Sequence, residues 1–301
     1  AGGAMTLDPD AARRAIEESV ARPLGLSTEE AAWGIYQIVT SNMELATRVV
    51  SIERGRDPRD LTFIAFGGAG PLHGCRLARA LGIPRVVLPA AAGVTAAIGL
   101  LVAEVKFDVT RTYIKRLEEV DLEYLNRIYH EMETQALAVI RASAATGEVT
   151  LLRSVDLRYL GQGYELTVAV PSGSLGATEL GRLRAAFDEA YAARYGYANP
   201  GEPVEVVNWK LSAIGAGPRV ALPKLDRACS LDEALKHRRP AFFQETGGFV
   251  QCPVFDRYRL SPGLKLEGPA IVEERESTTL LPPGTYARCD DYGNLLAEVA
   301  P

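Results

Sequence analysis

The sequence predicts an α/β protein with a β-rich C-terminal region. A short apolar run at 63–66 leads through a glycine-rich turn into a helical segment and then a second apolar run at 85–88, giving the order strand, turn, helix, strand. Long segments with apolar residues at helical spacing lie on both sides of this unit. Beyond about residue 203, Gly and Pro pairs divide the chain into short segments that are typical of strands.

Two helices are predicted before the first strand. Asp8 and Pro9 suit the N-cap and N1 positions of a helix that ends at Gly25. Ser27 and Glu30 form a capping-box pattern at the start of a longer second helix. Apolar residues recur along it at helical spacing: Ala31, Ile35, Ile38, Leu45, Val49 and Ile52.

A glycine-rich corner follows the first strand. The run at 63–66 suits a strand buried on both faces. The corner after it consists of Gly67, Gly68, Ala69 and Gly70. Its glycines permit positive φ and leave no side chain to hold a ligand at a distance. Pro71 suits a first helical position, so we expect a helix N-terminus there, which is a favourable place for a phosphate or another anion.

The corner alone does not define a nucleotide site. The spacing G-x-G-x-x-G is missing, and no G-K-[ST] follows. Corners of this kind also serve only for close packing of a helix on a strand. The second strand, at 85–88, is followed by a helix rich in small residues from Gly93 to Leu101, which could approach another backbone closely.

The remainder of the chain is predicted to form two further domains. The middle part contains, in order, a strand at 105–114, a helix from Asp121, a hairpin of strands 149–159 and 164–170, a helix at 177–195 and a strand at 204–214. The regular Gly and Pro breakers beyond it predict a small β barrel or sandwich. We therefore expect domains at 1–105, 106–220 and 221–301.

The corner and the segments after it resemble the hydantoinase A/oxoprolinase family. The resemblance rests on FGGAGPLHG, LGIPRVVLP and GVTAAIGLL, and it extends through LDPDAARRAI, VSIERGRDPRD, DLRYLGQGYELTVAVP and EGPAIVEERESTTLLPPG. This family includes ATP-dependent hydantoinases, 5-oxoprolinases and the nucleotide-binding subunits of acetone- and acetophenone-type carboxylases. Its nucleotide-binding part is similar to the actin-like ATPases, which have a ribonuclease H-like fold.

The resemblance implies that residues 1–105 are the second half of an actin-like lobe that binds ATP. The residues it implies for nucleotide binding are Gly67, Gly68, Ala69, Gly70, Gly93 and Thr95. A three-stranded meander should precede such a half-lobe, and the opposite lobe should carry the loop and the Asp that hold triphosphate and Mg²⁺. The sequence shows neither feature and no metal site. We therefore expect a C-terminal portion that needs an N-terminal complement, with a hydantoinase B-like subunit as a further partner.

His73 is the candidate catalytic residue. It lies in the first turn of the helix after the corner, where the positive end of the helix dipole lowers the pKa and favours a neutral imidazole. Such an imidazole could donate a hydrogen bond to a phosphate or accept a proton from an attacking group. It could equally be a packing residue that fixes the corner, and the sequence leaves both interpretations open.

Two polar clusters also allow two interpretations each. The first surrounds the turn of the predicted hairpin: Asp156, Arg158, Gln162 and Glu165. It could contact a substrate or a partner subunit, but a salt-linked polar face is favoured. The second is an acidic run: Glu273, Glu274 and Glu276. Its carboxylates could bind a divalent metal, but a solvated edge strand is favoured because no histidine lies nearby.

Composition limits the function classes. The chain has 301 residues and a net charge of -5, which argues against a nucleic-acid surface. It has no apolar stretch near the ~20 residues that a membrane span needs, so we expect a cytoplasmic protein. The family resemblance implies an ATP-dependent cyclic amide hydrolase, with a subunit of a ketone carboxylase as an alternative; a non-catalytic assembly module is a third hypothesis. The sequence does not indicate which small-molecule substrate is used.

Overall fold

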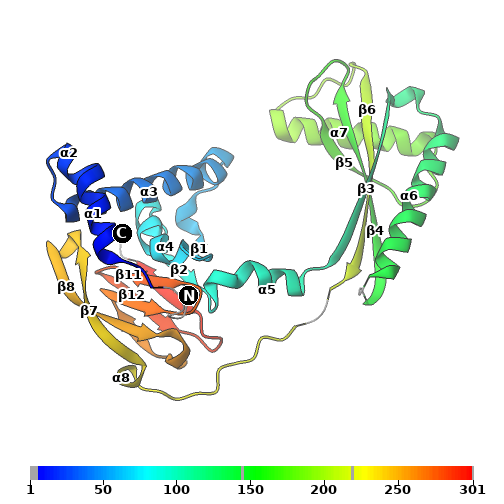
Figure 1. Ribbon diagram of the computed structural model, residues 1–301. Coiled ribbons are helices and arrows are strands. Elements are labelled where there is room, and N and C mark those ends of the chain that lie inside the picture. The colour runs from blue at the N-terminus through cyan, green and yellow to red at the C-terminus, as the bar shows by residue number, and fades with distance from the viewer. Residues whose placement is uncertain (1–5, 144–145, 218–219, 300–301) are drawn as a thin grey trace. The chain divides into compact units, whose positions relative to one another are not determined.

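The computed structural model describes residues 6–143, 146–217 and 220–299 and divides the chain into two compact units (Figure 1). Unit 1 combines Ala1–Gly99 with Ala221–Pro301, and unit 2 is Leu100–Val220. The structure thus differs from the three expected domains. The reason is that strands from the last 80 or so residues pair with strands from the first hundred.

The two N-terminal helical segments of unit 1 begin at the predicted caps, and the first also ends at the predicted Gly25. They are α1 (Pro9–Ile16), a π-helical turn (Glu17–Ala21), α2 (Arg22–Leu24) and α3 (Thr28–Val50). Asp8 accepts the N–H of Ala11 at 2.9 Å, and Gly25 ends α2 with a φ of 66°. At the start of α3, Ser27 and Glu30 exchange the two hydrogen bonds of a capping box. These helix starts are confirmed.

Two sheets and helix α4 (Gly70–Leu81) form the core of unit 1. A five-stranded sheet has the order β1 (Thr62–Ile64), β2 (Arg85–Leu88), β13 (Leu295–Val299), β12 (Thr285–Cys289) and β9 (Lys265–Glu267). A four-stranded sheet has the order β11 (Thr278–Leu281), β10 (Ala270–Glu273), β8 (Gly248–Asp256) and β7 (Leu235–Phe243). Only β1 with β2 and β10 with β8 are parallel among the neighbouring pairs of these two sheets. Helices α5 (Thr95–Val102) and α8 (Leu231–Ala234) also begin in this unit.

Of the two forms expected for the C-terminal region, a barrel or a sandwich, the barrel is wrong. In the described part of the chain neither sheet of unit 1 closes, and β13 joins the sheet that β1 and β2 begin, with Leu296 opposite Val87. Gly and Pro breakers locate strand ends, but they do not determine which distant strand becomes the partner.

Unit 1 leaves apolar side chains uncovered near β1. The prediction of a strand buried on both faces is wrong, because β1 lies at the edge of its sheet and Ile64 and Phe66 are 56% and 51% exposed. The apolar stripe of α3 is also largely open. Of its residues Ala31 is buried, whereas Ile38 and Leu45 are more than half exposed. The apolar run at 63–66 therefore predicts a strand, but it does not show which segment covers the apolar side chains of that strand.

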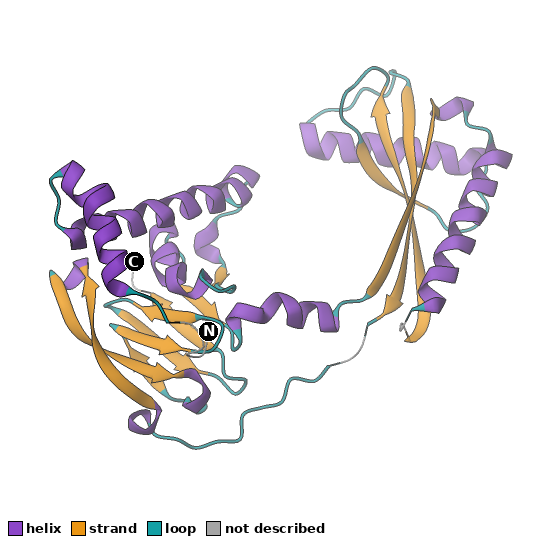
Figure 2. Cartoon of the chain, in the orientation of Figure 1, coloured by secondary structure: helices purple, strands orange, loops and turns teal. Residues whose placement is uncertain are grey.

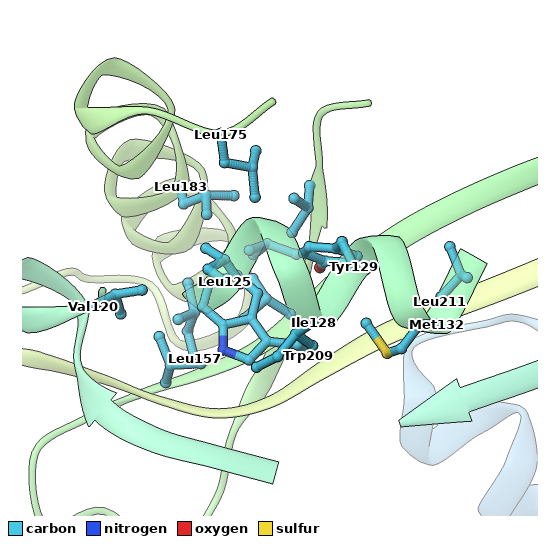
Figure 3. Packing of buried hydrophobic residues seen from close by; sticks show 14 of the residues in the cluster. Val120, Leu125, Ile128, Tyr129, Met132, Leu157, Leu175, Leu183, Trp209 and Leu211 are labelled. Atoms are coloured by element: carbon cyan, nitrogen blue, oxygen red, sulfur yellow. The ribbon is translucent and has the colours of Figure 1, made fainter. Parts of the chain in front are cut away.

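Unit 2 is an antiparallel sheet with two helices on one face (Figure 2). The sheet order is β3 (Val105–Arg116), β6 (Val204–Ala216), β4 (Thr146–Tyr159) and β5 (Leu166–Val170). Helices α6 (Leu122–Ala142) and α7 (Ala177–Tyr195) supply the apolar layer over it. The antiparallel pairing of β4 with β5 confirms the predicted hairpin, and both predicted helices are present. In this core Tyr129 meets Trp209 edge to face at 5.9 Å and donates a hydrogen bond to the Ser154 carbonyl at 3.1 Å (Figure 3).

Asp156 anchors the opposite, polar face of this sheet. It is only 1% exposed, and its carboxylate accepts hydrogen bonds from Lys210 at 2.7 Å, Thr167 at 2.6 Å and Asn208 at 3.1 Å. Burial acts to raise the pKa of Asp156, but these three hydrogen bonds outweigh it and lower the pKa. Arg158 likewise pairs with Glu205 at 2.9 Å on this sheet. The geometry therefore supports the structural interpretation of this polar cluster.

We expect Asp156→Ala to destabilise unit 2 by about 2 kcal/mol, because it removes the acceptor of three hydrogen bonds, one of them from a cation. Asp108→Ala is the matched control, since Asp108 lies on β3 with its side chain 59% exposed. Urea unfolding followed by Trp209 fluorescence, in a chain with Trp33→Phe, reports unit 2 alone. Because folding lowers the pKa of Asp156, its contribution should be present at neutral pH and be lost as the pH falls through that pKa, below 3.8. Equal midpoints for both variants would contradict this account.

Candidate functional site

The glycine corner lies open between β1 and α4. Gly67 has a φ of 91°, which only glycine adopts readily, and its N–H donates to the Ala92 carbonyl at 2.8 Å. Gly68 is exposed and has ordinary backbone angles, and a Cβ there would lie 3.7 Å from the Glu276 carbonyl oxygen. Gly67 is therefore required by the backbone, whereas the structure has room for a side chain at Gly68.

The N-terminus of α4 has no side-chain cap. Ala69 is the N-cap residue and offers no side-chain acceptor to the first-turn N–H groups. The helix begins at Gly70, one residue before the predicted start, and Pro71 lies in its first turn. A Cβ on Gly70 would be in ordinary contact, 3.7 Å from the Ala65 carbonyl carbon. Pro71 has no N–H and the N–H of Leu72 donates to the Ala69 carbonyl at 3.1 Å, so what suits an anion here is the uncapped positive end of α4 beside an exposed corner.

The second predicted turn packs against the C-terminal part of the chain. A Cβ on Gly93 would lie 2.4 Å from the Glu276 carbonyl oxygen, so no side chain fits there. The hydroxyl of Thr95 lies 3.2 Å from the carbonyl oxygens of Ala91 and Ala92, its hydrogen-bond acceptors. Gly93 and Thr95 thus have local structural roles, and their contact with a nucleotide stays a prediction.

His73 lies in the interface between α3 and α4. The imidazole is 7% exposed, its Nδ1 is 3.0 Å from the Thr40 hydroxyl, and its ring stacks on Tyr36 with centroids 4.6 Å apart. Burial lowers the pKa of His73 and favours the neutral imidazole. Tyr36 also donates to the Leu72 carbonyl at 3.0 Å, which ties α3 to the first turn of α4. This geometry favours the packing interpretation, and a catalytic role for His73 stays a prediction.

Sequence reasoning missed two features that position the corner. The first is Gly74, where a Cβ would lie 2.5 Å from the Ala65 Cβ, so this glycine lets α4 approach β1. Its spacing of four from Gly70, on one helix face, was an available signal. Beside it, Cys75 is buried, and burial raises its thiol pKa to about 12, so it is unreactive.

The second missed feature is the turn formed by residues 274–277, between β10 and β11. Ser277 donates to the Gly68 carbonyl at 3.2 Å, and Glu274 accepts the N–H of Ala91 at 3.0 Å. The carboxylates of the acidic run therefore have different partners, because Glu273 pairs with Lys236 at 2.6 Å, whereas Glu274 accepts the Ala91 N–H.

In the described ranges no three His, Cys, Asp or Glu side chains gather as metal ligands would. None of the helices described there is both long and apolar enough to cross a membrane.

The fold and the corner define a mixed α/β protein with an open, glycine-rich strand-to-helix turn. The chain belongs to the hydantoinase/oxoprolinase family: residues 1–109 match the Hydantoinase/oxoprolinase family model and residues 115–297 match the Hydantoinase/oxoprolinase C-terminal domain. Its relatives include the caprolactamase subunit alpha of Pseudomonas jessenii, 34% identical over 96% of this chain and 42% of that protein. A 5-oxoprolinase of Arabidopsis thaliana is 25% identical over 92% of this chain and 22% of the relative.

Two solved structures share this fold. The ATP-dependent caprolactamase of Pseudomonas jessenii has a TM-score of 0.75 and 32% identity over 99% of this chain and 44% of that chain. Acetone carboxylase, in a nucleotide-free structure, has a TM-score of 0.79 and 23% identity over the same shares, and this likeness concerns the fold alone. The chain therefore spans less than half the length of these relatives.

We expect Gly93→Ala to destabilise unit 1 by about 1–3 kcal/mol, because the added methyl group must displace the Glu276 backbone. Gly68→Ala should change stability by less than about 0.5 kcal/mol, since its Cβ meets only an ordinary contact and the site is exposed. Thermal unfolding of both variants by circular dichroism tests the difference. Equal losses at Gly68 and Gly93 would show that the 274–277 turn does not set the space at these positions.

Proposed function

We propose that the corner from Gly67 to Gly70 is one wall of an ATP-binding cleft, in the second half of an actin-like lobe. The observation that carries this proposal is the uncapped N-terminus of α4 beside the exposed Gly68. Positive φ at Gly67 turns the chain without a side chain, and a Cβ there would have no atom within 4 Å. A phosphate-bearing ligand fits such a corner, because it can approach the bare backbone and the uncapped end of α4 together.

The other wall of this cleft is supplied by an N-terminal complement. Strand β1 pairs only with β2 among the described strands, so its other edge can accept a further strand. Ile64 and Phe66 are half exposed at this edge, and the open stripe of α3 includes Ile38 and Leu45. The chain also spans about 42% of the caprolactamase alpha subunit. A three-stranded meander from the complement would cover these apolar groups, and ligands for Mg²⁺ would come from the complement as well.

The assembled protein would be an ATP-dependent cyclic amide hydrolase of the hydantoinase or oxoprolinase type. ATP supplies a phosphoryl group that makes a poor amide electrophile reactive, and a hydantoinase B-like subunit is the expected partner. The identity to caprolactamase over nearly the whole chain supports this activity over the ketone carboxylase alternative. Turnover of acetone with bicarbonate, and not of a lactam, hydantoin or 5-oxoproline, would favour the carboxylase. An assembly without any turnover would favour a non-catalytic module.

Calorimetric titration with ATP tests the cleft. We expect no binding to this chain alone and measurable binding once the complement is present. In the complete assembly Gly68→Val should weaken ATP at least tenfold and leave the far-UV circular dichroism nearly unchanged, because the side chain fills space that the ligand needs.

Gly201→Val is the control, since Gly201 also has open space and ordinary backbone angles but lies in unit 2. Unaltered ATP affinity in Gly68→Val would remove the corner from the site. Binding and turnover by the isolated chain would refute the need for a complement.

A further inference from the structure

The loop between β2 and α5 has a backbone conformation that a distant carboxylate holds in place. Ala91 has a φ of 54°, and it is the one non-glycine residue with positive φ among those described. Left-handed backbone is unfavourable for alanine, so it persists where surrounding contacts fix it. The N–H of Ala91 donates to Oε2 of Glu274 at 3.0 Å, and the N–H of Ala90 donates to Asn294 at 3.1 Å. Both acceptors come from the C-terminal part of unit 1.

The groups that hold this loop include a buried guanidinium and a half-buried carboxylate. Arg257 is 4% exposed and donates to the Leu88 carbonyl at 2.6 Å, while its Nε and Nη1 have no hydrogen-bond partner. Oε1 of Glu274 is likewise buried without a partner. Removing a guanidinium and a carboxylate from water is costly when their hydrogen bonds are incomplete. Holding the loop with these groups costs desolvation free energy. From this cost we infer that the conformation of the loop matters for function.

The turn that carries Glu274 also touches the glycine corner. Ser277 donates to the Gly68 carbonyl at 3.2 Å, and the Glu276 backbone occupies the space beside Gly93. The two loops also meet directly, since the N–H of Gly67 donates to the Ala92 carbonyl at 2.8 Å. The 274–277 turn therefore fixes both loops at once and sets the distance between them.

We propose that Glu274 is a positioning residue for the nucleotide, which acts by holding the Ala91–Gly93 turn in register with the Gly67–Gly68 corner. This inference rests on the proposed function, in which the corner faces ATP, and it adds the Ala91–Gly93 turn to the same cleft wall. Glu274 does not contact the ligand. Its carboxylate fixes the Ala91 N–H, and the strained loop in turn fixes the backbone that meets the corner.

The test compares variants of the complete assembly by calorimetric titration with ATP and by thermal unfolding. Glu274→Ala should weaken ATP binding about tenfold or more, because no acceptor remains for the Ala91 N–H. Glu274→Gln should stay within about threefold of the parent, since its amide oxygen can accept the same bond. Glu273→Ala is the control: it removes the neighbouring carboxylate, which pairs with Lys236, and should leave ATP affinity unchanged.

A second change separates positioning from general stability. Ala91→Gly, which permits the left-handed backbone without strain, should recover part of the affinity lost in Glu274→Ala. If Glu274→Ala fails to fold, Ser277→Ala takes its place, because it removes only the hydroxyl bonded to Gly68 and should weaken ATP about threefold. ATP affinity equal to that of the parent in Glu274→Ala, or in Ser277→Ala where that variant replaces it, would overturn the proposal. Equal losses of ATP affinity in Glu274→Gln and Glu274→Ala would overturn it as well. No binding by the parent assembly would instead refute the ATP cleft itself.

Discussion

The backbone of Glu276 lies so close to Gly93 that no side chain fits between them, and the architecture of unit 1 depends on this contact. It brings the turn at 274–277 against the loop after β2, and the hydrogen bond from Gly67 to Ala92 extends the contact to the glycine corner. Strand β13 beside β2 adds a continuous sheet beneath these loops. The candidate cleft wall is therefore built jointly by the first hundred and the last eighty or so residues, and neither segment determines its shape alone.

Features set by neighbouring residues could be predicted from the sequence. The capping box of Ser27 and Glu30 and the left-handed end at Gly25 depend on a few adjacent residues, and both are present. The hairpin of β4 and β5 and the extent of α7 follow from local periodicity in the same way. The turn at Gly67 belongs to this group too, because a positive φ is a local property that glycine reveals.

Features set by distant partners could not be predicted. The sequence does not show that Gly93 must be a glycine because the Glu276 backbone lies beside it. The ring of His73 turns to Thr40 and Tyr36 on α3, and helical position alone does not give that direction. The apolar run around Ile64 indicated a strand, yet the same run suits a buried strand and a strand whose cover comes from another segment. Strands β9, β12 and β13 were expected in a separate domain, because the sequence of a short strand does not show which distant strand it pairs with.

The central claim is that the glycine corner and the Ala91–Gly93 turn together meet a nucleotide. Amide hydrogen exchange of the complete assembly, with and without ATP, tests it most directly, because exchange reports the protection of individual backbone segments. The account predicts slower exchange with ATP in peptides that cover residues 67–72 and 90–93, and unchanged exchange in the sheet of unit 2. Protection by ATP elsewhere, with these two segments unaffected, would contradict it.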